Sequence, residues 1–320
     1  MYFFLITIVF LKEKGIVKNW LIHQKKDSFI IYYTIDKNFD RYAEELRVLR
    51  FDLKKNKVKT KRIYRDKNGI GDIKIKNDTL FFSLYDYLKD KKTKKLKKIF
   101  LYKNGKINKI FEEKRKNYFF YKFDFYEDKE NKGILVDKRG KIIFLSKDKE
   151  KEISTGIFPV FFNSYIFFLH GKEEGKVNSL FKIKEGEDKK VVFDRETVLE
   201  LDKENNFLFF LTDSDNDLLP EKVYIIDSLL NLNLLFESEN HIIIKPSFFL
   251  KKDTLFALLS LSEEFIPEKI LLLKIHKNKI KSQKEIIKRK GIEGKWLNYP
   301  HIILLEKKEN YSLFELISLK

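Results

Sequence analysis

A short pattern recurs seven times along this chain of 320 residues, and each copy is a polar turn pair followed by large apolar residues. Clear copies begin at Asp27, Asp78, Asn163, Asn205 and Asp253, and weaker copies begin at Asn131 and Tyr299. Successive copies are separated by 51, 53, 32, 42, 48 and 46 residues. Repeats of about 40 to 50 residues are typical of small structural units stacked in one fold. This repeat therefore limits the possible folds more than any other feature does.

Each period is predicted to hold four strands, and the apolar run of the repeat is the second, because an unbroken run is typical of a strand covered on both faces. The turn pair Asn104-Gly105 predicts a type I′ hairpin after a third strand. The shortest period, 32 residues, still accommodates four strands if its turns are tight. First strands are expected at 16–22, 71–76, 119–126, 156–162, 198–202, 242–250 and 293–298, and third strands at 48–52, 98–103, 141–146, 179–184, 222–227, 270–275 and 311–316.

Composition favours strands over helices. The chain contains 31 Phe and 15 Tyr but only two Ala, and aromatic residues favour strands whereas Ala favours helices. Two alternatives stay open. One is more helix: Tyr42, Leu46, Leu49 and Leu53 fall at helical spacing, and Lys279–Lys290 could form a strand or a helix. The other is two β-sandwich-like domains that meet near the charge run Lys147–Lys151.

The two ends of the chain complement each other in this scheme. The last period ends near Leu316 and lacks a fourth strand, whereas the apolar segment Tyr2–Phe10 precedes the first period and has no period of its own. Pairing this segment with the last three strands would complete the final sheet and remove an exposed edge.

The repeat order resembles that of the β-propellers over nearly the whole chain. The resemblance implies an all-β fold, a seven-bladed β-propeller of four-stranded blades that forms a single domain over 1–320, closed by strand 2–10. The Gly-His and Trp-Asp pairs of WD40 blades and the double Gly of kelch blades are absent, and no copy has the turn of TolB-like PD40 blades. The resemblance therefore implies a fold and no site residues.

The formal net charge of +18 makes this a basic protein. Lys residues are spread along the chain among 48 acidic residues, so we expect no specific nucleic-acid binding. The densest basic run, Lys89–Lys98, is interpreted as a solvated loop between a second and a third strand. The absence of Cys excludes disulfides and Cys metal sites, and one Met beside abundant Lys and Glu fits a thermophilic source.

The segment Tyr2–Leu11 has the length of a signal-peptide core but lacks basic residues before it and a small-residue cleavage site after it. We interpret it as a buried strand and expect a cytoplasmic protein. The alternative is an exported or membrane-anchored protein. No apolar run is long enough to form a membrane-spanning helix.

Candidate metal ligands are few. Asp213, Asp215 and Asp217 alternate in a short segment and could offer oxygens to calcium, but Leu218 stands where a calcium loop needs Gly and Tyr224 where it needs Glu. We therefore expect a solvated loop, no metal and no cofactor. His170, His241 and His301 lie near predicted strand ends and are weak candidates for a shared site. Trp20 and Trp296 are interpreted as core residues.

No nucleophile elbow, Walker motif or dinucleotide glycine motif occurs. The loops between second and third strands vary in length and charge, which favours a non-catalytic binding or scaffold module that contacts a protein or another macromolecule through this loop face. The alternative is a hydrolase or lyase with a site at the central channel mouth. We expect a monomer.

Overall fold

The computed structural model describes residues 6–25, 28–55, 57–88, 93–114, 120–128, 131–146, 149–172, 176–184, 186–204, 207–215, 217–239, 241–263, 266–276, 279–298 and 300–319. Every regular element in these ranges is a β-strand. No helix in them has the length and apolarity needed to cross a membrane. These strands confirm the all-β prediction. Aromatic and branched side chains, which favour strands, dominate the described core.

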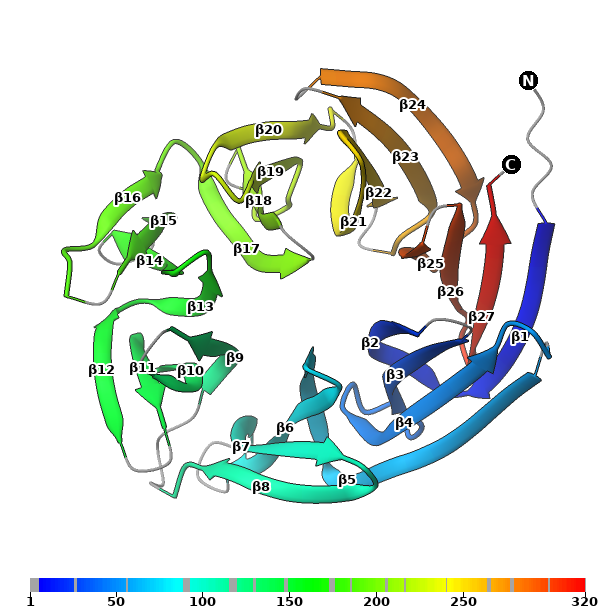
Figure 1. The fold of residues 1–320 in the computed structure, drawn as a ribbon, viewed down its shortest axis with the longest axis horizontal. Coiled ribbons are helices and arrows are strands. Elements are labelled where there is room, and N and C mark those ends of the chain that lie inside the picture. Colours follow the sequence, from blue (N-terminus) through cyan, green and yellow to red (C-terminus); the bar gives the residue numbers. More distant parts are fainter. Residues whose placement is uncertain are drawn as a thin grey trace. The chain divides into compact units, whose positions relative to one another are not determined.

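The strands follow one another with short connections (Figure 1). They are β1 Ile6–Lys14, β2 Ile16–Lys25, β3 Ser28–Asp36, β4 Ala43–Asp52, β5 Lys57–Lys76, β6 Thr79–Leu88, β7 Thr93–Lys103, β8 Lys106–Glu112, β9 Phe120–Glu127, β10 Lys132–Lys138, β11 Lys141–Leu145, β12 Glu150–Thr155, β13 Ile157–Phe162, β14 Tyr165–Lys172, β15 Lys176–Ile183, β16 Lys190–Phe193, β17 Thr197–Glu204, β18 Phe207–Asp213, β19 Lys222–Ile226, β20 Leu232–Glu237, β21 Ile242–Lys251, β22 Thr254–Ser262, β23 Lys269–His276, β24 Lys279–Lys288, β25 Ile292–Asn298, β26 His301–Lys307 and β27 Tyr311–Ser318.

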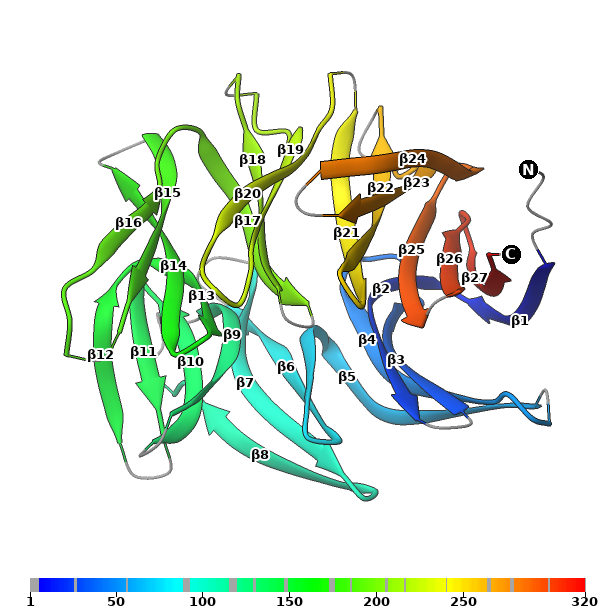
Figure 2. The same cartoon turned by 45° about the horizontal axis from the view of Figure 1, so that its top comes forward.

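Antiparallel pairing groups these strands in fours. Separate sheets have the orders β13-β14-β15-β16, β17-β18-β19-β20, β21-β22-β23-β24 and β25-β26-β27-β1. The remaining strands form one larger sheet, in which the long strand β5 pairs with β4 through its first half and with β6 through its second half (Figure 2). The single residue pair Leu96–Phe120 joins β7 to β9 in that sheet.

In each of the seven copies the described apolar run lies on a strand, namely β3, β6, β10, β14, β18, β22 and β26. The predicted hairpin is confirmed, because Asn104 and Gly105 both have positive φ and Lys103 pairs with Lys106. The shortest period, 131–162, accommodates the four strands β10 to β13 because only Gly156 separates β12 from β13. A Cβ atom on Gly156 would lie 2.4 Å from the ring of Phe168, so the close connection requires glycine.

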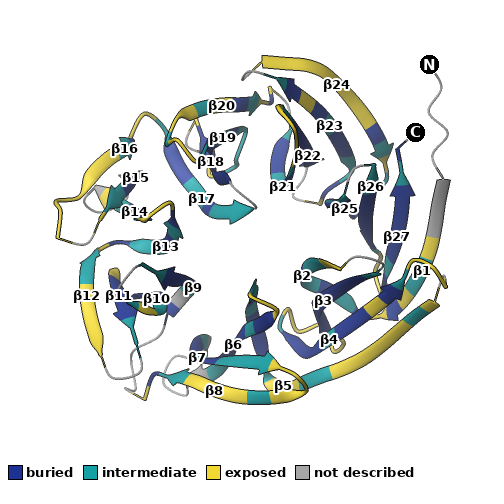
Figure 3. Cartoon of the chain, in the orientation of Figure 1, coloured by how far each residue is buried: buried dark blue, intermediate teal, exposed yellow. Residues whose placement is uncertain are grey.

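Burial falls from the second strand to the fourth (Figure 3). Every residue of β18 is buried, whereas most of β24 is exposed. This gradient is the reason for the unbroken apolar runs: the second strand is covered on both faces, and the fourth strand forms the outer edge of its sheet.

The chain divides into two compact units, residues 1–120 with 297–320, and residues 121–296. In the first unit β1 pairs with β27 over most of its length. The ring of Phe10 on β1 lies 5.2 Å from that of Phe51 and 5.8 Å from that of Phe29. The second unit contains a core formed by the facing sheets β17–β20 and β21–β24, including Phe209, Leu235 and Phe248.

Two interpretations of the sequence need correction. Leu46 and Leu49 lie in β4 and Lys279–Lys288 form β24, so the helical alternative is wrong. The alternative of two domains that meet near residue 150 also fails to match, because neither unit boundary falls there.

The basic run Lys89–Lys98 is also not a loop throughout. Strand β7 begins at Thr93 because its pairing with β6 continues to Leu88, and Lys97 is buried. Residues 89–92 lie outside the described residues.

Candidate binding face

The predicted aspartate cluster lies in the loop between β18 and β19. Asp213 ends β18 and is only 1% exposed, and its carboxylate accepts hydrogen bonds from the backbone N–H groups of Asp215 and Leu218, at 3.1 and 2.8 Å. Asp215 and Asp217 are exposed. The expectation of a solvated loop is therefore wrong for Asp213, whose buried carboxylate folds the loop around itself.

Glu221 is a fourth carboxylate in this loop that sequence reasoning missed. Its ligand atom and those of Asp213, Asp215 and Asp217 lie within 4.8 Å of one another. Glu221 accepts hydrogen bonds from the backbone N–H and the hydroxyl of Ser214. Desolvation raises the pKa of Glu221, and the charges of Asp215 and Asp213 raise it further. The geometry shows an acidic loop that folds around its own carboxylates, and the absence of a strong calcium site there stays a prediction.

A second charged group lies beside this loop, before β21 and between β22 and β23. His241, Glu263 and Glu268 each place one ligand atom within 4.8 Å of the others. The ammonium of Lys269 donates a hydrogen bond of 2.6 Å to Nε2 of His241, which lies 3.5 Å from the carboxylate of Glu263. Because Lys269 occupies the lone pair that a metal would need at Nε2, this group is a hydrogen-bonded cluster rather than an open metal site.

Backbone hydrogen bonds join these loops at one end of the two sheets. The N–H of Ile243 donates to the carbonyl of Pro220 at 2.7 Å, and the N–H of Ser238 donates to the carbonyl of Glu221 at 2.9 Å. Lys222 pairs with Glu196 at 2.6 Å and with Glu237 at 3.2 Å. These two carboxylates raise the pKa of Lys222 to about 12. The loops therefore form one continuous surface.

The chain segment 196–268, which contains these loops, differs in charge from the rest of the chain. Residues 196–268 contain 15 Asp and Glu, five Lys and no Arg, a net charge of −10, whereas the whole chain carries +18. Large apolar side chains are also exposed here: Leu218 is 70% exposed and Ile266 is 46% exposed. We name the binding face as the exposed residues Asp215, Asp217, Leu218, Glu263 and Ile266.

The remaining histidines have local partners. His170 packs edge-on against Phe181, at 5.6 Å between ring centroids, and desolvation lowers its pKa. Nδ1 of His301 lies 2.7 Å from the hydroxyl of Ser318. Among the described histidines, only His241 belongs to a group of potential metal ligands.

Trp20 and Trp296 are both core residues, as expected. Trp20 is 5.8 Å from Phe314, and Trp296 lies 5.7 Å from Phe249 between ring centroids. Tyr299, where the last copy of the repeat begins, lies outside the described residues.

Two carboxylates of first strands, the buried Asp124 and the half-buried Glu204, join neighbouring sheets. Asp124 on β9 accepts hydrogen bonds from the backbone N–H of Phe161 and from the ammonium of Lys203, at 2.8 and 2.6 Å. Glu204 on β17 accepts from the hydroxyl of Ser247 and the N–H of Phe248 on β21. Desolvation raises the pKa of Glu204. These contacts tie β9 to β13 and β17, and β17 to β21, and they account for two carboxylates that could otherwise be taken for catalytic groups.

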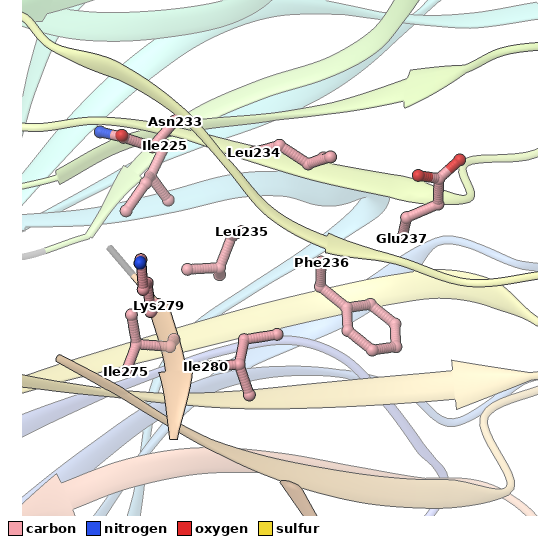
Figure 4. A pocket seen from close by; sticks show the side chains of 9 residues that line it. All are labelled: Ile225, Asn233, Leu234, Leu235, Phe236, Glu237, Ile275, Lys279 and Ile280. Atoms are coloured by element: carbon pink, nitrogen blue, oxygen red, sulfur yellow. The ribbon is translucent and has the colours of Figure 1, made fainter. Parts of the chain in front are cut away.

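An apolar groove of about 380 Å³ lies between the outer strands of the same two sheets (Figure 4). Ile225, Leu235 and Ile275 are part of the buried core and form its floor. Its rim is formed by Asn233, Leu234, Phe236, Glu237, Lys279 and Ile280. Sequence reasoning missed this groove, because its lining residues come from strands that are separated in the chain.

Comparison with known proteins identifies the fold. No family model matches the chain, and no curated protein matches it. A crystal structure of BBS1N in complex with ARL6DN matches 98% of this chain and 97% of its own at 10% identity and a TM-score of 0.58. The β-propeller domain of the trilobed protease from Pyrococcus furiosus matches 96% and 94% at 13% identity and a TM-score of 0.56.

The acylaminoacyl peptidase of Pyrococcus horikoshii matches 93% of this chain but only 50% of its own, at 11% identity and a TM-score of 0.53. The resemblance to β-propellers is thereby confirmed. At these identities the matches establish the fold alone.

Proposed function

We propose that the chain is a non-catalytic β-propeller of seven four-stranded blades, a single domain closed by β1, that binds a partner protein through the binding face. The seven sequence copies, the four-stranded antiparallel sheets and the pairing of β1 with β27 support the blade count and the closure. The structure in which BBS1N is complexed with ARL6DN gives a precedent for a protein partner on a domain of this fold.

The observation that carries the proposal is the joint exposure of acidic and large apolar side chains on the binding face. Leu218 and Ile266 stand among Asp215, Asp217 and Glu263 in a chain that is otherwise basic. Exposed apolar groups with a charged surround are typical of interaction surfaces. The partner segment that complements this face carries Lys or Arg beside a large apolar side chain.

A hydrolase or lyase would need carboxylates or histidines that converge in one pocket. The carboxylates of Asp213, Asp124 and Glu204 are each engaged in hydrogen bonds that fold a loop or join two strands. The one groove described above is lined mainly by apolar groups. These observations favour binding over catalysis.

Selection of random peptides displayed on phage against the immobilised full-length protein tests the proposal. The expected consensus contains basic and large apolar residues, and the double variant Asp215→Lys with Leu218→Asp should no longer select it. The matched control is Leu229→Asp, a change of an 80% exposed leucine in the turn between β19 and β20. If the double variant recovers the same basic peptides as the wild type, the binding face is not the site.

A further inference from the structure

The strand β20 is unusual among the outer strands of this protein. The fourth strands of the four-stranded sets are β1, β5, β8, β12, β16, β20 and β24, and all of them except β20 contain Lys. The sequence of β20 is LNLLFE. Proteins protect edge strands against pairing with other chains by placing Lys on them. This protection is missing on β20.

The edge of β20 is open in its sheet. β20 lies last in the order β17-β18-β19-β20, and its register with β19 pairs Lys222 with Glu237 and Ile226 with Leu232. The backbone groups on its other edge make no ladder to β24, because β24 belongs to a different sheet. An extended segment could therefore continue the hydrogen-bond ladder beyond β20.

The groove between β20 and β24 offers apolar contacts to such a segment. Leu234 is 46% exposed and Ile280 is 45% exposed, and both lie on its rim with the partly buried ring of Phe236 (Figure 4). The floor is the core between the two sheets. Side chains at alternate positions of an extended chain point to the same face, so they could enter the groove in succession.

The charges of the groove favour an acidic occupant. Glu237 is already paired with Lys222 at 3.2 Å. Lys279 lines the groove and makes no ion pair to the described residues. Lys281 and Lys288 are also exposed on β24, where Glu285 is the single acid. A carboxylate on the occupant would therefore meet an excess of ammonium groups.

We propose that the groove between β20 and β24 binds an extended segment of a partner protein, with apolar side chains at alternate positions and a flanking Asp or Glu, which adds a strand to β20. This site is separate from the binding face, and its ligand has the opposite charge. Failure of one proposal therefore leaves the other standing.

Fluorescence anisotropy with a labelled synthetic peptide tests the inference on the full-length protein. The probe has Val at alternate positions, Thr between them and Asp at both ends, and a second probe has Lys in place of Asp. The Asp probe is expected to bind, and Leu234→Lys should weaken it at least about tenfold, since Lys both charges the edge and removes an apolar contact. Val191→Lys on β16, where valine is 53% exposed, is the matched control and should leave binding unchanged.

Two further measurements distinguish strand addition from nonspecific binding of the probe. Lys279→Glu should weaken the Asp probe and strengthen the Lys probe, a reversal that loss of fold cannot produce. N-methylation of the probe amides that face β20 should abolish binding, whereas methylation of the alternate amides should not.

Three outcomes would overturn the inference: the Asp and Lys probes bind equally well, N-methylation has no effect at any position, or neither probe binds. Dimerisation in sedimentation that Leu234→Lys removes would also overturn it, because the occupant would then be a second copy of this chain.

Discussion

The guanidinium of Arg47 donates hydrogen bonds of 3.1 Å to both carboxylate oxygens of Glu13. Glu13 lies on β1, and Arg47 lies on β4 of the neighbouring sheet. The hydroxyl of Tyr33 donates a further hydrogen bond of 2.6 Å to Glu13, and burial together with this contact raises the pKa of Tyr33 far above its usual value. The N-terminal strand is thus held by a buried polar network as well as by its pairing with β27.

The aromatic contacts of β1 predict the effect of losing it. Phe10→Ala should lower the free energy of unfolding by about 1–3 kcal/mol, because the ring packs against Phe29, Phe51 and Phe314 but is only half-buried. The adjacent change Val9→Ala is the control, since Val9 is 57% exposed. Removal of residues 1–11 should cost several kcal/mol. Denaturant unfolding measures the free energy of unfolding of both variants and of the truncated protein. An unchanged midpoint after truncation would contradict the role of this strand in closure.

Glu204 predicts a pH dependence of stability. Its pKa in the folded protein is raised by desolvation, so the stability it contributes is present below its unfolded pKa and is lost as pH rises through the folded value. Relative to wild type, Glu204→Gln should therefore become more stable as pH increases above about 4.5. Denaturant midpoints of the two proteins across this range provide the measurement. A difference that stays constant with pH would mean that the carboxyl group is not desolvated.

Calcium binding at Asp213, Asp215 and Asp217 is expected to be weak or absent. The carboxylate of Asp213 already accepts two backbone N–H groups, and Asp215 and Asp217 each accept one. Isothermal titration with calcium should show no micromolar site. A micromolar site that disappears in Asp215→Asn would show that the loop opens to take the ion.

Nucleic-acid binding is expected to be electrostatic only. A chain with a net charge of +18 should associate with duplex DNA and single-stranded RNA at low salt. This affinity should disappear between about 50 and 200 mM salt without dependence on sequence. Submicromolar, sequence-dependent binding at the higher salt, lost when Lys91, Lys92, Lys94 and Lys95 are neutralised, would make that segment a functional site.

Strand order was predictable from the sequence because its signals are local. The turn pair Asn104-Gly105 requires positive φ at both positions, and runs such as Phe207–Leu211 indicate a strand buried on both faces. The basic run Lys89–Lys98 was misinterpreted because only its local composition was considered. Its composition resembles a loop, but pairing between β6 and β7 extends the strand to Thr93.

The sequence by itself determined the all-β class, the succession of strands and the Lys-free segment that becomes β20. Only the tertiary structure decided that the carboxylate of Asp213 turns into its own loop, that Lys222 joins Glu196 to Glu237, and that Leu234 and Ile280 share one groove. The physical reason is the range of the interactions. Turn geometry and the alternation of a strand depend on adjacent residues, whereas a groove or an ion pair depends on which strand edges meet, and pairing between residues far apart in the chain sets that.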